Sequence, residues 1–546
     1  MRILDWLVLG GSLIFILAYG LWRSRGSDSV NKYLLGGKTM PWYAMALSIM
    51  ATQASAITFI STTGQAYVDG MRFVQFYFGL PFAMVLIAWY VVPRFHRSGV
   101  YTAYEFLERR FDSKTRMLVS IIFLIQRGLA VGVALYAPAV VLTVIFGWPN
   151  QVTSTVMGVL VLSYTGVGGI QAVTWTDFQQ MLVMFAGLLI SLFTAIYLLP
   201  GSTSFSDALA LAGAAGRLNP VVLSFSWTDT YNLGSGLIGG LFLALAYFGT
   251  DQSQVQRYLT GRDIGQSRLS LLFNGMAKVP MQFLILLTGT MVFVFYSFEK
   301  PPINFDRPAL EKMQAKPGYA DLERKYDAAF AERRGAAESY VRTKSWTELE
   351  AFRAANRHME KVRAEAGVKD TNYVFLGFVT HYLPVGAVGL IMAAIFAAAM
   401  STISGEVNSL ATVTVIDVYQ RYWKKGASDG HYLMASRLFT AFWCSYAIVT
   451  AQFGASLGSL IEAVNRLGSY FYGGMLGVFV LAFFFPRVKG NAAFTAVFIG
   501  EAAIFSAAAF TNIFFLWYNV IGAVVVVVSG VVLSLPQSGS ETAREA

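Results

Sequence analysis

The chain has 546 residues, of which 55% are hydrophobic and only 13% are charged, and its 41 Lys and Arg against 31 Asp and Glu give a formal net charge of +10 at pH 7. This composition excludes a soluble globular domain. Apolar runs long enough to cross a hydrocarbon core of roughly 30 Å recur from end to end, so the sequence predicts an all-α polytopic membrane protein.

Thirteen apolar runs predict about thirteen transmembrane helices. They lie near residues 4–23, 41–67, 73–95, 117–146, 150–166, 177–199, 232–252, 269–298, 378–411, 433–453, 456–485, 492–513 and 514–535. The first run is followed by Arg23, Arg25 and Lys32 instead of a small-residue cleavage site. We therefore interpret residues 1–32 as an extra, retained N-terminal helix and not as a signal peptide.

The short loops between these runs differ in their positive charge. One alternate set carries Arg23, Arg25, Lys32, Lys38, Arg94, Arg97, Arg109, Arg110, Lys114, Arg116, Arg257, Arg262, Arg268, Arg421, Lys424, Lys425, Arg487 and Lys489. Positive loops face the cytoplasm, so we expect a multi-pass protein of the cell inner or plasma membrane with its N-terminus outside and its C-terminus inside. The net charge is mostly this topology signal, and no nucleic-acid partner is predicted.

One hydrophilic segment interrupts the apolar pattern, between about residues 299 and 371. From 299 to 370 it carries 15 Lys and Arg and 13 Asp and Glu, with apolar residues at helical spacing. Long loops are exempt from the positive-inside rule. By parity the segment lies outside, as an extracellular or periplasmic insertion of two or three amphipathic helices, either a solvated cap or a docking module for a partner or ligand.

Two apolar spans carry interruptions that a simple anchor helix would not need. The span near 41–67 contains Thr52, Gln53, Ser55, Thr58, Ser61, Thr62, Thr63 and Gly64, and the span near 232–252 is glycine-rich and ends in Thr250, Asp251 and Gln252. Unwound backbone survives at membrane depth only where it lines a cavity, and two such spans five helices apart are typical of inverted-repeat transporters. Single hydroxyls could instead bond their own helix. The two repeats would cover about 41–199 and 232–485.

The stretch AIFAAAMSTISGEVNS, residues 394–409, places polar side chains inside a long apolar run. On a helix, Ser401, Ser404 and Asn408 share one face, with Thr402 at its edge. Small residues allow a second backbone to approach, and hydroxyls supply neutral oxygens. A hard monovalent cation needs several such oxygens and few formal charges.

Six sequence motifs carry a resemblance to a known family. They are YLLGGKTMPWY (33–43), YTAYEFLERRF (101–111), YAPAVVL (136–142), GGIQAVTWTDFQQ (168–180), GTDQSQVQRYL (249–259) and the run LPVGAVGLIMAAIFAAAMSTISGEVNSLATVTVIDVY (383–419). As a set they resemble the sodium:solute symporter family, whose relatives include the glucose, proline, iodide, multivitamin, monocarboxylate and sialic acid transporters. The resemblance implies a LeuT-type core within residues 33–485, followed by two C-terminal helices and a short cytoplasmic tail (486–546).

The resemblance also implies a sodium site between the first and eighth core helices. Its ligands would be the carbonyls of Ala51, Ala54 and Ala398 and the hydroxyls of Ser401 and Thr402. A second sodium, which some members bind, would lie at Asp177 and Ser404. Gly405 stands where the two-sodium sialic acid transporters have another serine, which leaves that second ion open, and Asp177 could also be a residue at a helix end.

The solute site implied by the resemblance uses the first, sixth and tenth core helices. The predicted binding or gating residues are Gln53, Ser55, Thr58, Gln75, Arg127, Tyr247 and Asn465, with Tyr247 as the inner gate. Ile57, Thr58 and Ala244 replace polar residues of the sugar branch, so glucose is not favoured. Arg127 lies deep in an apolar span and needs a partner. That partner could be a solute carboxylate, Glu406 or a backbone carbonyl, and Asp251 and Glu406 could line the inner water path or pair with Arg257.

Together these features predict a sodium-coupled symporter that imports a small organic solute. The expected partners are the solute, Na⁺ as coupling ion and membrane lipid, and a monomer would suffice. Proton-coupled or sodium-independent transport is the alternative within the fold. A sensor fused to a kinase would need more chain after the last span than PQSGSETAREA offers. An enzyme is disfavoured, because with four histidines no metal-spaced cluster and no nucleophile–base pair is readable.

Overall fold

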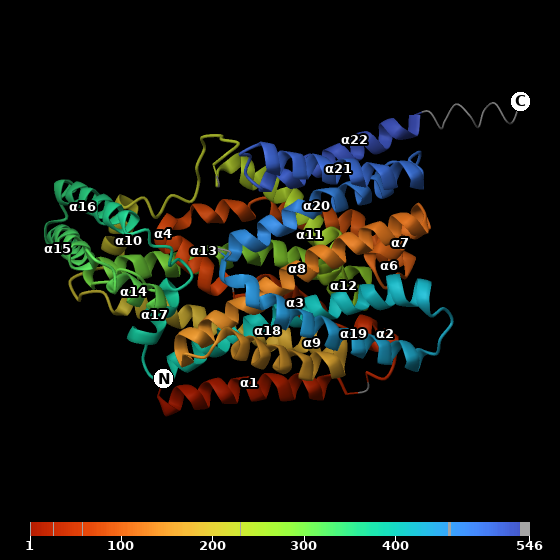
Figure 1. The fold of residues 1–546 in the computed structure, drawn as a ribbon, viewed down its shortest axis with the longest axis horizontal. Coiled ribbons are helices and arrows are strands. Elements are labelled where there is room, and N and C mark those ends of the chain that lie inside the picture. Colours follow the sequence, from red (N-terminus) through yellow and green to blue (C-terminus); the bar gives the residue numbers. More distant parts are fainter. Residues whose placement is uncertain (1, 26, 57, 230, 457–459, 536–546) are drawn as a thin grey trace, which may run out of the picture.

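The computed structural model describes residues 2–25, 27–56, 58–229, 231–456 and 460–535. Within these residues every element is helical, apart from one isolated bridge between Met40 and Gly261. Most long helices lie side by side along the longest axis of the molecule (Figure 1). Residues 536–546, which include the predicted tail, fall outside the described part, as does Ile57.

The bundle contains fifteen α-helices longer than a single turn and several shorter pieces. The former are α1 (Ile3–Arg23), α3 (Trp42–Gln53), α4 (Thr63–Asp69), α5 (Leu80–Leu86), α6 (Val92–Ser98), α8 (Ser113–Phe146), α9 (Asn150–Tyr197), α11 (Gly240–Gly249), α12 (Gln252–Leu259), α13 (Ile264–Phe298), α18 (Ala387–Val413), α19 (Asp429–Thr450), α20 (Leu460–Phe484), α21 (Gly490–Phe510) and α22 (Leu516–Ser534). Helices α2 (Val30–Leu35), α7 (Ala103–Arg110), α10 (Phe205–Ala214) and α17 (Val374–Tyr382) flank it. The π-helical segments are Thr58–Thr62, Ile87–Val91, Ser235–Gly239 and Thr414–Trp423, and the 3₁₀ segments are Gly36–Lys38, Gly70–Tyr77 and Ala451–Ser456.

Ten helices of the described chain are long and apolar enough to cross a membrane. The count differs from the thirteen predicted runs for three reasons. Helix α9 contains two of the runs, on either side of Gly169, whose φ of 56° breaks the helix. The run near 232–252 forms the shorter apolar helix Ser235–Gly249, and the run near 41–67 is divided between α3 and the span Thr58–Ser98. The polytopic all-helical class is confirmed, and the total of thirteen stays a prediction.

Both interrupted spans are broken in the structure. Helix α3 ends at Gln53, and the chain resumes as the π-helix Thr58–Thr62 before α4. Helix α11 ends at Gly249 and α12 begins at Gln252, where the Asp251 carboxylate accepts a hydrogen bond from the Ser253 amide at 2.9 Å. Such caps satisfy donors that a helix end leaves free. The assignment of these breaks to two inverted repeats remains a prediction.

Helix α18 is the buried centre of the bundle. All of its residues from 391 to 413 are buried, and it packs against α9, α1 and α8. Its N-terminus is held by α1, because Asp5 Oδ1 accepts hydrogen bonds from the amides of Gly386 (2.6 Å) and Gly389 (3.2 Å). A Cβ on Gly389 would lie 2.2 Å from the Asp5 carbonyl oxygen, so only glycine allows this close approach.

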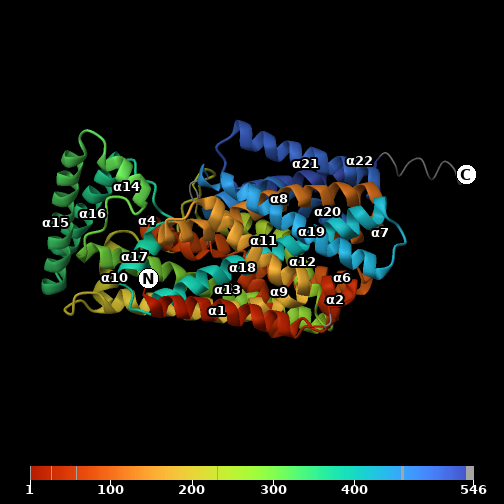
Figure 2. The ribbon, with the colours of Figure 1, turned by 60° about the horizontal axis from the view of Figure 1, so that its bottom comes forward.

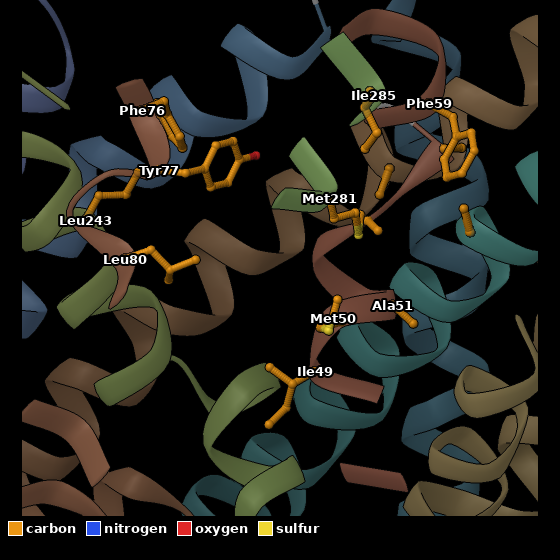
Figure 3. Packing of buried hydrophobic residues seen from close by; sticks show 14 of the residues in the cluster. Ile49, Met50, Ala51, Phe59, Phe76, Tyr77, Leu80, Leu243, Met281 and Ile285 are labelled. Atoms are coloured by element: carbon orange, nitrogen blue, oxygen red, sulfur yellow. The ribbon is translucent and has the colours of Figure 1, made fainter. Parts of the chain in front are cut away.

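Beside α18, helix α3 packs into an apolar cluster with α13. Figure 3 shows Ile49, Met50 and Ala51 of α3 together with Met281 and Ile285 of α13, all of which are buried. Inside a membrane such packing is stabilised by close van der Waals contact and not by removal of apolar surface from water. The cluster fixes α3 up to the residue where the span breaks.

The charged insertion forms three helices, α14 (Arg307–Gln314), α15 (Tyr319–Thr343) and α16 (Trp346–Glu365). It lies at the end of the bundle where α1 begins, and α6 and α7 lie at the opposite end (Figures 1 and 2). Tyr326, Phe330 and Met359 form part of a small core of its own. The loop cations predicted to share one side therefore gather away from the insertion.

Two of the cations assigned to loops are corrected by the structure. Arg116 and Arg257 are 6% and 1% exposed and lie in buried ion pairs. Arg116 Nε donates to Asp417 at 2.6 Å, and Arg257 pairs with Asp177. Their charges serve packing inside the bundle, because a buried guanidinium needs a carboxylate partner. The topology signal rests on the remaining loop residues.

The Asp5 cap generates a stability prediction. Asp5→Ala removes both hydrogen bonds to the start of α18 and should cost about 1 kcal/mol, which lowers the thermal midpoint of the purified protein by about 1 °C. Asp28→Ala is the control, because Asp28 pairs with Lys32 on the surface. Equal midpoints for the two variants in a thermal-unfolding assay would contradict the cap.

Candidate solute and cation site

A cavity of about 110 Å³ lies in the middle of the bundle. Its wall combines the broken span of α3, the segment around α5, and helices α8, α11, α18 and α20. It is lined by Thr52, Gln53, Ser55, Thr58, Phe76, Tyr77, Leu80, Arg127, Ala134, Gly240, Leu243, Ala244, Tyr247, Phe248, Thr402, Glu406, Val464, Asn465 and Tyr472. Residues more than 400 positions apart in the sequence thus meet at one site.

Six of the seven predicted solute or gate residues line this cavity. They are Gln53, Ser55, Thr58, Arg127, Tyr247 and Asn465. The seventh, Gln75, lies outside the described lining. Its amide accepts from the Val222 backbone at 2.9 Å and donates to the Tyr231 carbonyl at 3.2 Å. Through these bonds Gln75 holds the backbone of the loop before α11 in place, which favours a structural role.

The cavity wall is both aromatic and polar. Phe76, Tyr77, Leu80 and Leu243 lie together on one side (Figure 3). The rings of Tyr247 and Tyr472 lie 6.0 Å apart, and the Tyr247 hydroxyl accepts a hydrogen bond from Gln254 at 2.7 Å. Gln53 Oε1 is buried and has no hydrogen-bond partner among the described residues. An unpartnered buried acceptor is costly unless a ligand or water completes it, so the wall suits a polar organic molecule with an apolar or ring face.

The predicted cation ligands gather where α3 ends against α18. The Thr402 hydroxyl lies 3.1 Å from both the Thr52 and the Ala398 carbonyl oxygens. Ala51 and Ala54 flank Thr52 at the helix end, where the last carbonyls have no following turn to bond. Thr402 and Thr52 also line the cavity. The cation ligands and the solute cavity therefore share a wall.

The carboxylate predicted for a second cation already has a protein cation beside it. Asp177 Oδ2 accepts hydrogen bonds from Ser48 Oγ at 2.5 Å and from Arg257 Nη2 at 3.3 Å. Arg257 Nε also donates to Ser48 Oγ at 3.0 Å. The Ser404 hydroxyl turns to the Ser401 carbonyl at 3.1 Å. Both predicted second-site residues thus have protein partners.

Gly405 makes room for this guanidinium. A Cβ at Gly405 would lie 2.1 Å from Arg257 Nη2 and 2.9 Å from its Cζ, so a side chain there could not coexist with Arg257 in this position. The Ser401 hydroxyl lies near the Asp177 carboxyl group but makes no hydrogen bond of full geometry with the described residues.

Arg127 is held by two carboxylates at the wall of the cavity. Its Nη1 donates to Glu406 Oε1 at 2.8 Å, and its Nη2 contacts Asp251 and donates to the Tyr472 hydroxyl at 2.7 Å. The Tyr472 hydroxyl in turn donates to Asp251 at 3.0 Å. Of the partners considered for Arg127, the structure shows Glu406, and it adds Asp251. The cluster ties α8 to α12, α18 and α20.

Sequence reasoning missed two residues of this site. Tyr472 lines the cavity and bonds Arg127, but one tyrosine in an aromatic-rich span carries no distinctive signal. Arg257 was assigned to an inner loop because it follows an apolar run. No local signal separates Arg257 from a loop cation, because a helical turn of polar residues such as Gln254–Gln256–Arg257 would suit a solvent-exposed helix equally well.

Comparison with known proteins defines the class. The model of the sodium:solute symporter family matches residues 33–309 and 350–500. The chain belongs to this family, and it is a sodium-coupled solute symporter and a multi-pass membrane protein. The match leaves out residues 310–349, which include all of α15.

Individual relatives agree with the family. The sodium/sialic acid symporter NanT of Aliivibrio fischeri is 26% identical over 534 residues, which cover 96% of this chain and 92% of that protein. The sodium/sialic acid symporter SiaT of Proteus mirabilis is 25% identical, with 97% and 94% covered. The sodium/glucose cotransporter of Vibrio parahaemolyticus is 24% identical, with 90% and 83% covered.

A solved structure supports the same fold. A Na⁺-coupled sialic acid symporter in a substrate-bound outward-open state aligns with a TM-score of 0.78 at 24% identity, covering 98% of each chain. The predicted class, an all-helical polytopic protein with a LeuT-type core, is confirmed by this likeness.

The fit between Gly405 and Arg257 generates the second prediction. Gly405→Ala forces the guanidinium away from Asp177 and leaves both charges uncompensated, which should cost about 3 kcal/mol or more and lower the thermal midpoint clearly. Gly430→Ala is the matched control, because a Cβ at Gly430 meets nothing within 4 Å. A Gly405→Ala protein as stable as the control in the same detergent would refute the described packing.

Proposed function

We propose that the protein imports a small organic solute by alternating access, driven by one Na⁺ bound between α3 and α18. The ligands are the carbonyls of Ala51, Ala54 and Ala398 and the hydroxyls of Ser401 and Thr402. The observation that carries the proposal is the position of the Thr402 hydroxyl, 3.1 Å from carbonyls of both helices. Neutral oxygens from a broken helix and a facing helix suit a hard monovalent cation.

Coupling follows from the shared wall. A cation at this place would hold the end of α3 against α18 and so shape the cavity edge formed by Thr52 and Thr402. The solute would then bind better when sodium is bound, and by reciprocity sodium would bind better with solute. With the membrane negative inside, one Na⁺ contributes about 2.3 kcal/mol per 100 mV in addition to its concentration gradient.

The stoichiometry proposed is one sodium per cycle. Asp177 and Ser404 were candidates for a second ion, but the Arg257 guanidinium lies beside the Asp177 carboxylate. A buried carboxylate beside a guanidinium is already compensated and has little to gain from a second cation. Arg257 would therefore act as a built-in cation at this place.

Arg127 is proposed as a lock on the inner side of the cavity. Its ties to Asp251 and Glu406 join α8 to the break between α11 and α12 and to α18. The cavity then contains one cationic and one anionic lining residue among those described, Arg127 and Glu406, and these two are paired. An acidic solute would have to displace a carboxylate to reach Arg127.

The solute is therefore proposed to bind mainly through neutral hydrogen bonds. Gln53, Ser55, Thr58 and Asn465 supply amide and hydroxyl groups, and the aromatic wall covers an apolar or ring face. Two relatives are named for sialic acid, an acidic solute, and one for glucose. This chain would differ from an acid-binding relative in the group that pairs with Arg127.

The arrangement in the membrane completes the proposal. Residues 1–32 would be the extra helix, about 41–199 and 232–485 the two inverted repeats within the core 33–485, 299–371 an outside insertion, and 486–546 two helices and a cytoplasmic tail. The N-terminus would lie outside the inner or plasma membrane. One chain would suffice for transport, with lipid around it.

Two hydroxyl variants test the sodium site. Ser401→Ala and Thr402→Ala should each raise the sodium concentration for half-maximal uptake about tenfold or more, because each removes an oxygen that bonds a charged group, worth roughly 1.5 kcal/mol. Solute affinity at saturating sodium should change far less. The measurement is uptake into proteoliposomes, with a solute found by sodium-dependent thermal shift.

Ser409→Ala is the matched control, because its hydroxyl bonds the Glu406 carbonyl of the same helix at 2.8 Å. Its sodium dependence should equal that of the unmodified protein. Proton-coupled or sodium-independent transport would instead be favoured by uptake that does not depend on sodium. Unchanged sodium dependence in both site variants would count against the proposed site in the same way.

Glu406→Gln tests the lock. The variant removes one of the carboxylates that hold Arg127, so the inner side should open more readily, with uncoupled solute leak and solute KM within about threefold of the original. The measurement is solute efflux from preloaded proteoliposomes without sodium. If Glu406→Gln instead tightens binding of acidic solutes at least tenfold, Arg127 is a solute receptor and the lock is wrong.

A further inference from the structure

A second cavity lies apart from the solute site, between the insertion and the end of the bundle that the insertion contacts. It measures about 300 Å³ and shares no lining residue with the central cavity. Arg333 of α15, together with Asn356 and Arg363 of α16, lines it from the insertion. Arg217 enters from the loop after α10, and the bundle contributes Tyr67 of α4 and Phe293 of α13 among the lining residues.

The charges around this cavity do not balance. Arg363 Nη2 donates to both carboxylate oxygens of Asp370, at 2.7 and 2.8 Å, and Arg217 pairs with Glu360. Arg333 has no ion pair among the described residues, and its Nη2 donates to the Tyr296 carbonyl at 2.7 Å. Three guanidinium groups thus face two carboxylates, which leaves one positive charge over.

The excess charge is buried. Arg333 is only 3% exposed, and its Nε has no hydrogen-bond partner in the described part of the chain, nor has Nε of Arg217. Burial lowers the pKa of both Arg333 and Arg217, whereas for Arg363 the effect of burial is outweighed by Asp370 and the pKa is raised. A buried, under-compensated guanidinium with a free donor beside a cavity is costly unless an anion completes it.

We propose that this cavity binds a small oxyanion, a carboxylate or an inorganic anion such as sulfate, through Arg333 and Arg217. Guanidinium groups bind such anions with paired, charge-assisted hydrogen bonds. The rings of Phe293 and Phe330, which lie 5.1 Å from the Arg217 guanidinium and 5.8 Å from that of Arg333, hold the cations in place. The site is a property of this chain beyond the family pattern, because α15 lies in the segment that the family model leaves out.

The bound anion would join the insertion to α4. Tyr67 belongs to α4, which follows the break in this span, and its hydroxyl accepts a hydrogen bond from Arg363 at 3.4 Å. Gly64 of α4 lies directly against the backbone of Thr371, where any Cβ would collide. An anion between α15 and this contact would therefore fasten the insertion to α4. The inference does not depend on the number of sodium ions or on the solute.

The test is a thermal-shift titration of the purified full-length protein with potassium acetate and potassium sulfate, against potassium chloride at equal ionic strength. No sodium or solute is present, so failure of the proposed transport mechanism would not affect the result. We expect a saturable rise of the thermal midpoint by several degrees. A stronger response to acetate identifies an organic carboxylate as the ligand class, and a stronger response to sulfate identifies an inorganic oxyanion.

Arg333→Gln should weaken the apparent affinity at least tenfold. Arg334→Gln is the matched control, because Arg334 is the next residue on α15 and pairs with Glu338 on the surface. If Arg333→Gln does not fold, Arg217→Gln and Arg333→Lys serve in its place, and both should weaken binding. The proposal is overturned if no anion gives a saturable shift, or if the titrations of site and control variants coincide.

Discussion

The interior of this transporter depends on one constraint, which is that a helix broken inside a membrane must find partners for the carbonyls it frees. Helix α3 ends at Gln53 inside the bundle, where bulk water does not solvate the helix end. The Thr402 hydroxyl reaches the Thr52 carbonyl, and the Thr58 hydroxyl reaches that of Gln53 at 3.2 Å. In the proposed site a cation would bind the carbonyls of Ala51 and Ala54 beside this break. The break would thus supply two of the five proposed ligands, and α18 the other three.

Buried arginines are the second feature that organises the interior, because their ion pairs join separate helices. Arg257 lies against Gly405 of α18 and Arg127 bonds Glu406 of the same helix, and each guanidinium is compensated by carboxylates from other helices. Removing one member of such a pair is far more costly than the pair's net contribution, so the helices that these contacts join resist separation. The Arg257 pair joins α12 to α9, whereas the Arg127 cluster spans α8, α12, α18 and α20. Ion pairs of this kind are either formed or broken, which suits a protein proposed to alternate between two conformations.

Much of the fold follows from the sequence, because apolar length, polar interruptions and loop charge are local signals. The runs near 41–67 and 232–252 predicted the breaks after Gln53 and Gly249, and six of the seven solute residues line one cavity. Pairings could not be predicted, because they depend on which helices meet. No local feature of the sequence distinguishes Arg257 from a loop cation. Nor does any feature predict that the missing side chain of Gly405 leaves the space for the Arg257 guanidinium. Gln75 resembles a binding residue in sequence, and only the fold shows that it holds the backbone at Tyr231 and Val222.

In the proposed mechanism one Na⁺ binds between α3 and α18 while Arg257 takes the place of a second. Direct binding of radioactive ²²Na⁺ to the purified protein tests it without knowledge of the solute. We expect binding to saturate at one ion per chain along a simple hyperbola. Two ions per chain, or a sigmoidal curve, would contradict it.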